Sequence, residues 1–410
     1  MNIQKDFNIK PAFTLYLAQI VNLVLSWGIT KLNVSFLAVA EYGQFSFFIT
    51  FINATFILFT FGAFEASSRL MAITASPEDS TKLRSVSLIM AMFSYTLFSV
   101  FLLLCRDIIG NIFTVDISLL LGLYFPLAGV FLFYDYWQKM LRGAGKIYLL
   151  SLFLMTPRVV YLLSLLVLVY VHTFTLIHST LFNLLSFGVM LIIFISMERL
   201  NFRQLKVALN RLLREVKKFG FHMYWAELIQ ILLYHIDKLF IGFFLNAEQL
   251  AYYSLAFTIT LPLSLFSTSL STTLYKSFSQ TVKIESKVIF INLIWVLLSL
   301  LILILLGPWI VIHLFSEYYQ ASVPLLLPLA IAFGFSAQSK TFTFYLIAQG
   351  EGKIIRNISF ILLLGSLLLN VIFIPVWGIM GAAYVRLITF LIDFILVFIF
   401  YQRKQKKIAE

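Results

Sequence analysis

Two similar glycine-lysine segments each precede a long apolar run: Arg142-Gly143-Ala144-Gly145-Lys146-Ile147 and, about 207 residues later, Gln349-Gly350-Glu351-Gly352-Lys353-Ile354. A second pair keeps nearly the same spacing, because Ala40-Glu41-Tyr42-Gly43-Gln44-Phe45-Ser46 resembles Glu248-Gln249-Leu250-Ala251-Tyr252-Tyr253-Ser254. Two matched pairs at one offset indicate an internal duplication. In a membrane protein, duplicated bundles are typical of transporters, whose sites lie near the midplane between the repeats.

Composition places the chain in a membrane. Apolar residues make up 61% of it, charged residues make up 12%, and the mean hydropathy is +0.96. A water-soluble core could not bury so much apolar side chain. The 410 residues suit about twelve spans of roughly 20 residues with short loops. We therefore predict an all-α polytopic membrane protein, with about twelve transmembrane helices in two pseudo-symmetric six-helix bundles around a central cavity.

Twelve apolar runs have the length of a membrane span. They cover residues 12–30, 42–63, 84–105, 117–138, 147–171, 175–196, 220–245, 251–275, 288–313, 322–348, 354–376 and 378–400. Four segments are expected: an N-terminal bundle (1–198), a linker (199–219), a C-terminal bundle (220–402) and a basic tail (403–410). The first run lacks a small-residue cleavage site, so it is expected to remain as a span.

Basic residues predict the orientation. Most of the 30 Lys and Arg residues fall in the two termini and in the connections that follow even-numbered spans, whereas the other connections hold only Lys31 and Arg106. The positive-inside rule therefore predicts both termini in the cytoplasm. The net charge of +12 is explained by topology, and no nucleic-acid partner is expected, since no folded domain organises the basic residues.

The linker has the pattern of a basic amphipathic helix. Its apolar residues fall at helical spacing on one side, and its basic residues occupy much of the rest. The apolar set is Phe202, Leu205, Leu209, Leu212, Leu213 and Val216, and the basic set is Arg203, Lys206, Arg211, Arg214 and Lys217. Such a helix is expected to lie on the cytoplasmic leaflet and to contact anionic membrane lipids.

Several kinds of chemistry are not expected. None of the five histidines has metal-ligand spacing with another His, Cys or acidic residue, so no metal site is predicted. No glycine-rich phosphate loop ends in Gly-Lys-Ser/Thr, so an ATP-driven pump is not indicated. The predicted outer loops are short and carry few carboxylates, which argues against an integral-membrane glycosyltransferase or polymerase. We expect neither a cofactor nor enzyme activity.

Ionisable residues inside the predicted spans are the candidate site. Such residues are costly if they face lipid, so they are expected to face a cavity or one another. The cations are Arg158, Arg386, Lys31, Lys238 and Lys340, and the acids are Asp237, Glu227, Asp393 and Asp135. Two interpretations are open. The cations converge on a water-filled, substrate-binding cavity, or the charges form structural pairs: Asp237 with Lys31 or Lys340, and Asp393 with Arg386 two helical turns away. Asp237 is also a candidate for proton or cation coupling.

Five stretches carry a family resemblance: Glu41 to Ser46, Phe61 to Arg69, Glu317 to Ala321, Gly350 to Lys353 and, most specifically, Asn370 to Ala383. Their order resembles the Wzx-type polysaccharide flippases of the multidrug/oligosaccharidyl-lipid/polysaccharide (MOP) exporter superfamily, which handle repeat units of O-antigen or capsule. The motif positions that carry the resemblance are Gly62, Arg69, Asn370, Pro375, Gly378 and Gly381.

The resemblance implies a flippase for an undecaprenyl-pyrophosphate-linked oligosaccharide, working by alternating access in the bacterial inner membrane during lipopolysaccharide O-antigen or related polysaccharide biosynthesis. The implied partners are the lipid-linked oligosaccharide, a polysaccharide polymerase and a chain-length regulator. The cavity cations, Arg158 and Arg386 first, would hold the diphosphate and acidic sugars. Two alternatives stay open at this point: a MATE-like antiporter for drugs or cations, and an integral-membrane glycosyltransferase or polymerase.

Overall fold

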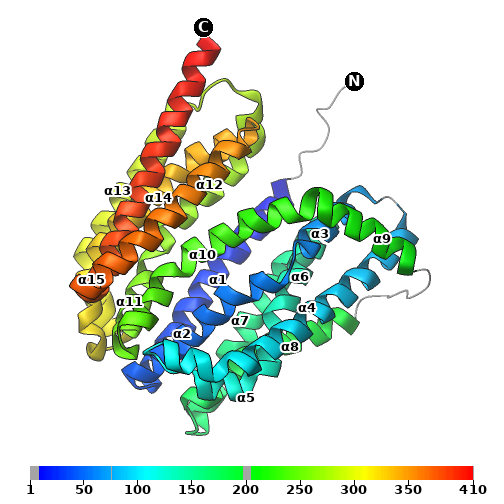
Figure 1. The fold of residues 1–410 in the computed structure, drawn as a ribbon. Helices are drawn as coiled ribbons and strands as arrows, with labels where there is room; N and C mark the ends of the chain where they lie inside the picture. The colour runs from blue at the N-terminus through cyan, green and yellow to red at the C-terminus, as the bar shows by residue number, and fades with distance from the viewer. Residues whose placement is uncertain (1–8, 75, 197–204, 410) are drawn as a thin grey trace. The chain divides into compact units, whose positions relative to one another are not determined.

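The computed structural model describes residues 9–74, 76–196 and 205–409, and every regular element in these ranges is helical. The first half contains α1 (Ile9–Phe36), α2 (Val39–Thr55), η1 (Phe56–Phe59), α3 (Ala63–Ile73), α4 (Pro77–Ile112), α5 (Ser118–Ala128), α6 (Val130–Gly143), α7 (Ile147–Tyr170) and α8 (Leu176–Ser196). The second half contains α9 (Leu205–Glu215), η2 (Val216–Gly220), α10 (Phe221–Phe244), α11 (Ala247–Thr260), α12 (Pro262–Gln280), α13 (Ser286–Trp309), η3 (Ile310–Phe315), η4 (Glu317–Ser322), α14 (Val323–Ala348) and α15 (Gly352–Ala409) (Figure 1).

Each predicted span coincides with a helix or with a bent helix pair. Eight spans in the described ranges are long and apolar enough to cross a membrane, and the pair α11 and α12, bent by 41°, forms a ninth. One of the eight is α15, which carries the last two predicted spans on either side of a backbone break at Gly378. The helices α1 and α10, with 28 and 24 residues, coincide with the other two predicted spans, 12–30 and 220–245. The predicted all-α, polytopic membrane fold is confirmed.

The chain forms two compact units. Unit 1 comprises residues 1–36, 51–110 and 117–228, and unit 2 comprises residues 37–50, 111–116 and 229–410. The change from one unit to the other after Leu228 falls inside α10. The predicted segment boundaries at residues 198, 219 and 402 stay a prediction. The predicted tail continues α15 as far as Ala409.

Unit 1 is held together by helix packing and by a buried polar joint. α1 packs on α7, α7 packs on α8, and α3 packs on α6. Where α1, α7 and α8 meet, Ser179 donates to the Asn33 side-chain oxygen at 2.6 Å, and the Asn33 amide donates to the Tyr161 hydroxyl at 3.3 Å. The Tyr161 and Ser179 hydroxyls lie 2.7 Å apart. All three side chains are buried, so their hydrogen bonds must be made inside the protein.

Unit 2 is built around α14. This helix packs against α11, α12, α13 and α15, which Figure 1 shows running beside it. A buried aromatic cluster that includes Phe342, Tyr345 and Tyr401 joins α14 to the last part of α15. At Gly378 the backbone takes φ 57° and ψ −139°, a conformation that side-chain-bearing residues rarely adopt. The break lets α15 supply two neighbouring spans instead of one long rod.

The linker forms the expected helix as far as it is described. Arg199, Phe202 and Arg203 lie outside the described residues. Within α9, Leu212 is fully buried, while Lys206, Arg211 and Arg214 are exposed. α9 packs on α3 in unit 1. The chain then passes through the π-helical turn η2 into α10.

Candidate functional site

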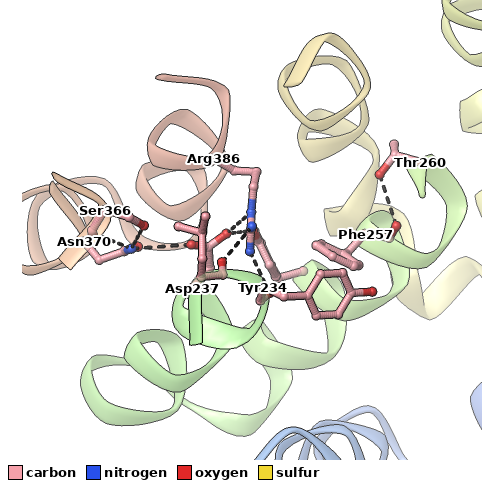
Figure 2. A network of polar contacts seen from close by, with 9 residues as sticks. Tyr234, Asp237, Phe257, Thr260, Ser366, Asn370 and Arg386 are labelled. Carbon is pink, nitrogen blue, oxygen red and sulfur yellow. Dashed lines mark hydrogen bonds and ion pairs between the residues drawn. The ribbon is translucent and has the colours of Figure 1, made fainter. Parts of the chain in front are cut away.

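A buried ion pair joins two helices of unit 2. Arg386 on α15 donates through Nε to the Asp237 carboxylate on α10 at 2.6 Å, and the two side chains are only 2% and 1% exposed. Two further guanidinium nitrogens donate to the backbone oxygens of Leu233 and Tyr234 at 3.0 and 2.9 Å. Figure 2 shows the guanidinium lying against α10, with Phe257 beside it. Three of its five N–H groups are therefore used within the protein.

Neighbouring polar groups complete the coordination of Asp237. The Tyr253 hydroxyl donates to it at 2.5 Å, and the Asn370 amide donates at 3.4 Å while also bonding the Ser366 backbone oxygen at 2.8 Å. Buried carboxylates need such donors because an isolated charge is very costly away from water. Asn370, selected from the sequence as a motif position, therefore helps to hold the charged centre of unit 2 (Figure 2).

This pairing corrects the pairings that the sequence suggested. Asp237 pairs with Arg386 within unit 2, and Asp393 accepts a hydrogen bond from Ser339 at 2.6 Å. The reason is helix packing, because the start of the last span lies beside the first span of the same half. The spacing of two helical turns favoured an ion pair between Arg386 and Asp393. Instead, Arg386 binds Asp237, and Asp393 binds Ser339.

The charged centre of unit 2 corresponds to the polar joint of unit 1. Each joins the first, fifth and sixth spans of its half: Asn33, Tyr161 and Ser179 in unit 1, and Asp237, Asn370 and Arg386 in unit 2. The paired positions are separated by close to the offset of the sequence repeat. The same three-helix junction is thus neutral in one unit and charged in the other. Because a neutral version suffices in unit 1, an ion pair is not needed to build such a junction.

A cavity of about 370 Å³ lies inside unit 2 beside the ion pair. Its size falls within the range of small-molecule sites, roughly 300–1,000 Å³. Its lining includes Lys340, Arg386 and Asp393 from the predicted site, together with the apolar rings of Phe333 and Phe390. Lys340 and Asp393 interact electrostatically. Unit 2 therefore gathers three of the predicted charged residues at one cavity.

Lys238 does not line this cavity, but it adds a positive charge near Arg386, at the same aromatic ring. Its ammonium lies 5.1 Å from the centre of the Phe257 ring, and the Arg386 guanidinium lies 5.6 Å from the same ring and 5.3 Å from that of Phe390. Cations at these distances are attracted by the ring faces. The three cations exceed the two carboxylates, Asp237 and Asp393, by one charge. The arrangement favours an anionic ligand over a cationic one.

Sequence reasoning missed the hydroxyl groups of the cavity. Ser264, Thr268, Ser336, Thr343 and Ser359 line it, and Gln230 supplies an amide. Hydroxyl and amide groups can both donate and accept hydrogen bonds, as sugar hydroxyls require. A signal was present, because Ser264 and Thr268 are four residues apart, and Ser336, Lys340 and Thr343 follow at four and three, which places each set on one helix face.

Two predicted cations belong to unit 1. Arg158 is half-buried on α7 and interacts electrostatically with Tyr134, and no acidic group pairs with it among the described residues of unit 1. Lys31 is half-buried near the end of α1. The expected convergence of all five cations on one cavity stays a prediction.

The remaining acids, Asp135 and Glu227, meet in unit 1 around Lys139, a basic residue of the connection that follows the fourth predicted span. Lys139 donates to Glu65, and it donates to Asp135 and Glu227 at 2.7 Å each. Lys139 and Glu65 are buried, with exposed side-chain fractions of 9% and 8%. The side chain of Lys139 is therefore held inside unit 1.

The other motif positions have local structural roles. Gly62 has φ 73° and lies so close to Gly220 that a side chain there would meet the Gly220 backbone. Arg69 pairs with Glu215 at 2.8 Å and lies over the Phe219 ring. Gly381 approaches the Phe373 carbonyl in α15, which also contains Pro375. These contacts pack the helices, whereas Lys340, Arg386 and Asp393 line the cavity of unit 2.

Comparisons with known proteins agree with this architecture. A MATE multidrug resistance transporter in an inward-facing conformation superposes with a TM-score of 0.75 at 14% identity, covering 96% of this chain and 95% of that one. The lipid II flippase MurJ, in an inward closed conformation, gives 0.78 at 16% identity, with 96% and 89% covered. A MOP superfamily transporter from Pyrococcus furiosus gives 0.64 at 14% identity, with 98% and 96% covered. At these identities the likeness shows the fold alone.

Among curated proteins, none matches the chain. The profile of the family described as polysaccharide biosynthesis protein does match it, over residues 9–282. That range is more than half of the sequence and includes the whole of unit 1 from α1 onward. The chain, an all-α membrane protein with the fold of the MOP superfamily transporters, belongs to the polysaccharide biosynthesis protein family.

Proposed function

We propose that this protein is a flippase that moves an undecaprenyl-pyrophosphate-linked oligosaccharide from the cytoplasmic to the outer face of the bacterial inner membrane, with both termini in the cytoplasm. It acts as a transporter and not as an enzyme. The cavity of unit 2 is the observation that carries the proposal: it has an excess of positive charge and a lining rich in hydroxyl groups. A diphosphate or an acidic sugar needs cations, and a saccharide needs groups that both donate and accept hydrogen bonds.

A difference between the two repeats supports this proposal: the three-helix junction is charged in unit 2 and neutral in unit 1. The first, fifth and sixth spans of unit 1 meet through neutral side chains, so charge at the matching junction of unit 2 has a role beyond packing. Arg386 keeps two N–H groups beyond those bound within the protein, and it lines the cavity. Those groups would bind the anionic headgroup, while the prenyl tail stays in lipid. Alternation between inward-open and outward-open states would carry the headgroup across.

Lys340 and Lys238 would assist Arg386, and Arg158 and Lys31 would serve the same substrate from unit 1. A polysaccharide polymerase and a chain-length regulator are the proposed partners that consume the translocated unit, as O-antigen or as another polysaccharide. Anionic membrane lipids would contact the exposed basic residues of α9, which include Lys206, Arg211 and Arg214.

Removal of the gene tests the function directly. The cells are expected to lose the surface polysaccharide and to accumulate its lipid-linked repeat unit on the cytoplasmic face, where a membrane-impermeant label added outside cannot reach it. Mass spectrometry of the accumulated glycolipid would give the sugar composition. Increased sensitivity to dyes or antibiotics with unchanged surface glycan would instead support an antiporter of drugs or cations. Purified protein that lengthens glycan chains would support a glycosyltransferase or polymerase.

A further inference from the structure

The Lys139 cluster of unit 1 is a buried group of ionisable residues that the proposed cavity does not use. It joins three helices, with Glu65 on α3, Asp135 and Lys139 on α6, and Glu227 on α10. The ammonium of Lys139 donates to all three carboxylates, so each of its three N–H groups is used. Oxygen atoms of the three carboxylates lie within 4.8 Å of one another. The cluster already contains its own cation at the point where they converge.

The charge of the cluster is not balanced. Three ionised carboxylates and one ammonium leave two negative charges in a site where Glu65 and Lys139 are more than nine-tenths buried. Arg142 also interacts with the cluster, through Asp135, and it is exposed. Arg69, the basic residue one turn after Glu65, is paired with Glu215. Uncompensated charge of one sign in a poorly solvated site favours uptake of the opposite charge.

The position of two oxygen atoms indicates which charge is taken up. Oxygen atoms of the Glu65 and Glu227 carboxyl groups lie within 4.8 Å of each other. The Oε2 atom of Glu65 is buried and finds no donor among the described residues. Two ionised carboxylates can only accept hydrogen bonds, so a bond between them requires a proton on one. A proton supplies both the missing donor and one of the missing positive charges.

We propose that Glu65 and Glu227 form a proton-binding site, in which one proton from water is held between the two carboxyl groups while Lys139 stays charged. Glu227 is the residue through which the site acts on the fold. It lies on the first part of α10, just before Leu228, where the chain leaves unit 1 for unit 2. Gain or loss of the proton changes how firmly unit 1 holds the start of that helix. The flippase would thereby respond to pH or to a proton gradient.

Proton uptake by purified protein tests the site without any transport assay. In detergent or nanodiscs, the wild-type protein is expected to bind about one proton more per molecule than Glu227→Gln above pH ~5, where ordinary carboxylates are already ionised. Infrared difference spectra should show a protonated carboxyl band that both Glu227→Gln and Glu65→Gln remove. Glu215→Gln, which alters the surface ion pair with Arg69, is the matched control and should retain the band.

Equal proton uptake and equal carboxyl bands in the wild type and in both cluster variants would overturn the proposal. Because glutamine resembles a protonated glutamate in shape, Glu227→Gln is expected to fold, and a folded Glu227→Gln protein with the wild-type band would be decisive. If the protein binds the proton but moves no lipid-linked sugar, the proton-binding site is supported and the proposed flippase function is contradicted.

Discussion

Arg386 lies in unit 2 where Ser179 lies in unit 1. Each residue lies near the start of the sixth span of its half, and each donates to a side chain on the first span, Arg386 to Asp237 and Ser179 to Asn33. The same three-helix junction can therefore be built with neutral or with charged side chains. In unit 2 it is charged, and Arg386 lines the cavity. A purely structural role and a substrate-binding role for Arg386 predict different results when both Asp237 and Arg386 are replaced by neutral residues.

We expect Arg386→Ser alone to destabilise the protein by about 3–5 kcal/mol, because it leaves the buried Asp237 carboxylate without its cation. The double variant Asp237→Asn/Arg386→Ser removes both charges and is expected to recover most of that loss. Thermal unfolding in detergent measures both effects. If Arg386 contacts the substrate, the stable double variant should still fail to restore surface polysaccharide in cells that lack the gene. Full restoration would assign the pair to structure alone.

The spans could be predicted because their signals are local. About twenty apolar residues define a span wherever it packs. The orientation that the basic residues indicate stays a prediction. The turn at Gly350 and Lys353 and the break at Gly378 were equally readable, since glycine marks backbone that other residues avoid. These features need no knowledge of which helices are neighbours.

The side-chain pairs could not be predicted because they depend on those neighbours. Arg386 and Asp237 are 149 residues apart, and no pattern within either helix links them. Lys139 lies in a connection that also carries Arg142 and Lys146, so the sequence counts it with the charges that indicate orientation. Only its contacts with α3 and α10 reveal that it is buried. The cavity hydroxyls escaped notice because serine and threonine are ordinary in membrane helices, where they bond the preceding turn.

Lys340 is expected to bind substrate without supporting the fold, because it is half-buried and its interaction with Asp393 is electrostatic. Lys340→Gln should weaken binding of an anionic headgroup by about 1.5–3 kcal/mol, or roughly tenfold to a hundredfold, while the unfolding temperature stays close to that of the wild type. Lys340→Arg should retain most activity. Complementation of surface polysaccharide is the measurement, and Lys287→Gln, which alters an exposed lysine on α13, is the control. Wild-type polysaccharide with Lys340→Gln would remove Lys340 from the site.

Gly378→Ala is expected to destabilise the end of unit 2. The backbone at this position has φ 57° and ψ −139°, and holding an alanine there costs about 1–3 kcal/mol. Gly365→Ala on the same helix is the matched control, because a methyl group there meets no atom within 4 Å and alanine favours a helix. Thermal unfolding of the two purified variants compares them directly. Equal unfolding temperatures would show that the break between the last two spans is not rigidly held.

Arg158 offers the sharpest test of unit 1, because it is half-buried and no acidic group pairs with it among the described residues of that unit. Its removal leaves no carboxylate unpaired, so Arg158→Ala should change the unfolding temperature little. If Arg158 binds the headgroup, Arg158→Ala should lower surface polysaccharide strongly and Arg158→Lys partly, since lysine keeps the charge but not the planar fork of donors.

Arg106→Ala is the control for Arg158. It removes an arginine of the same unit whose exposed pair with Asp107 is expected to contribute less than about 1 kcal/mol. Normal surface polysaccharide with both Arg158 variants would exclude this residue from translocation. Loss with Arg158→Ala and recovery with Arg158→Lys would show that the positive charge is what the substrate needs. The flippase proposed here would then draw on cations from both halves of the duplicated chain.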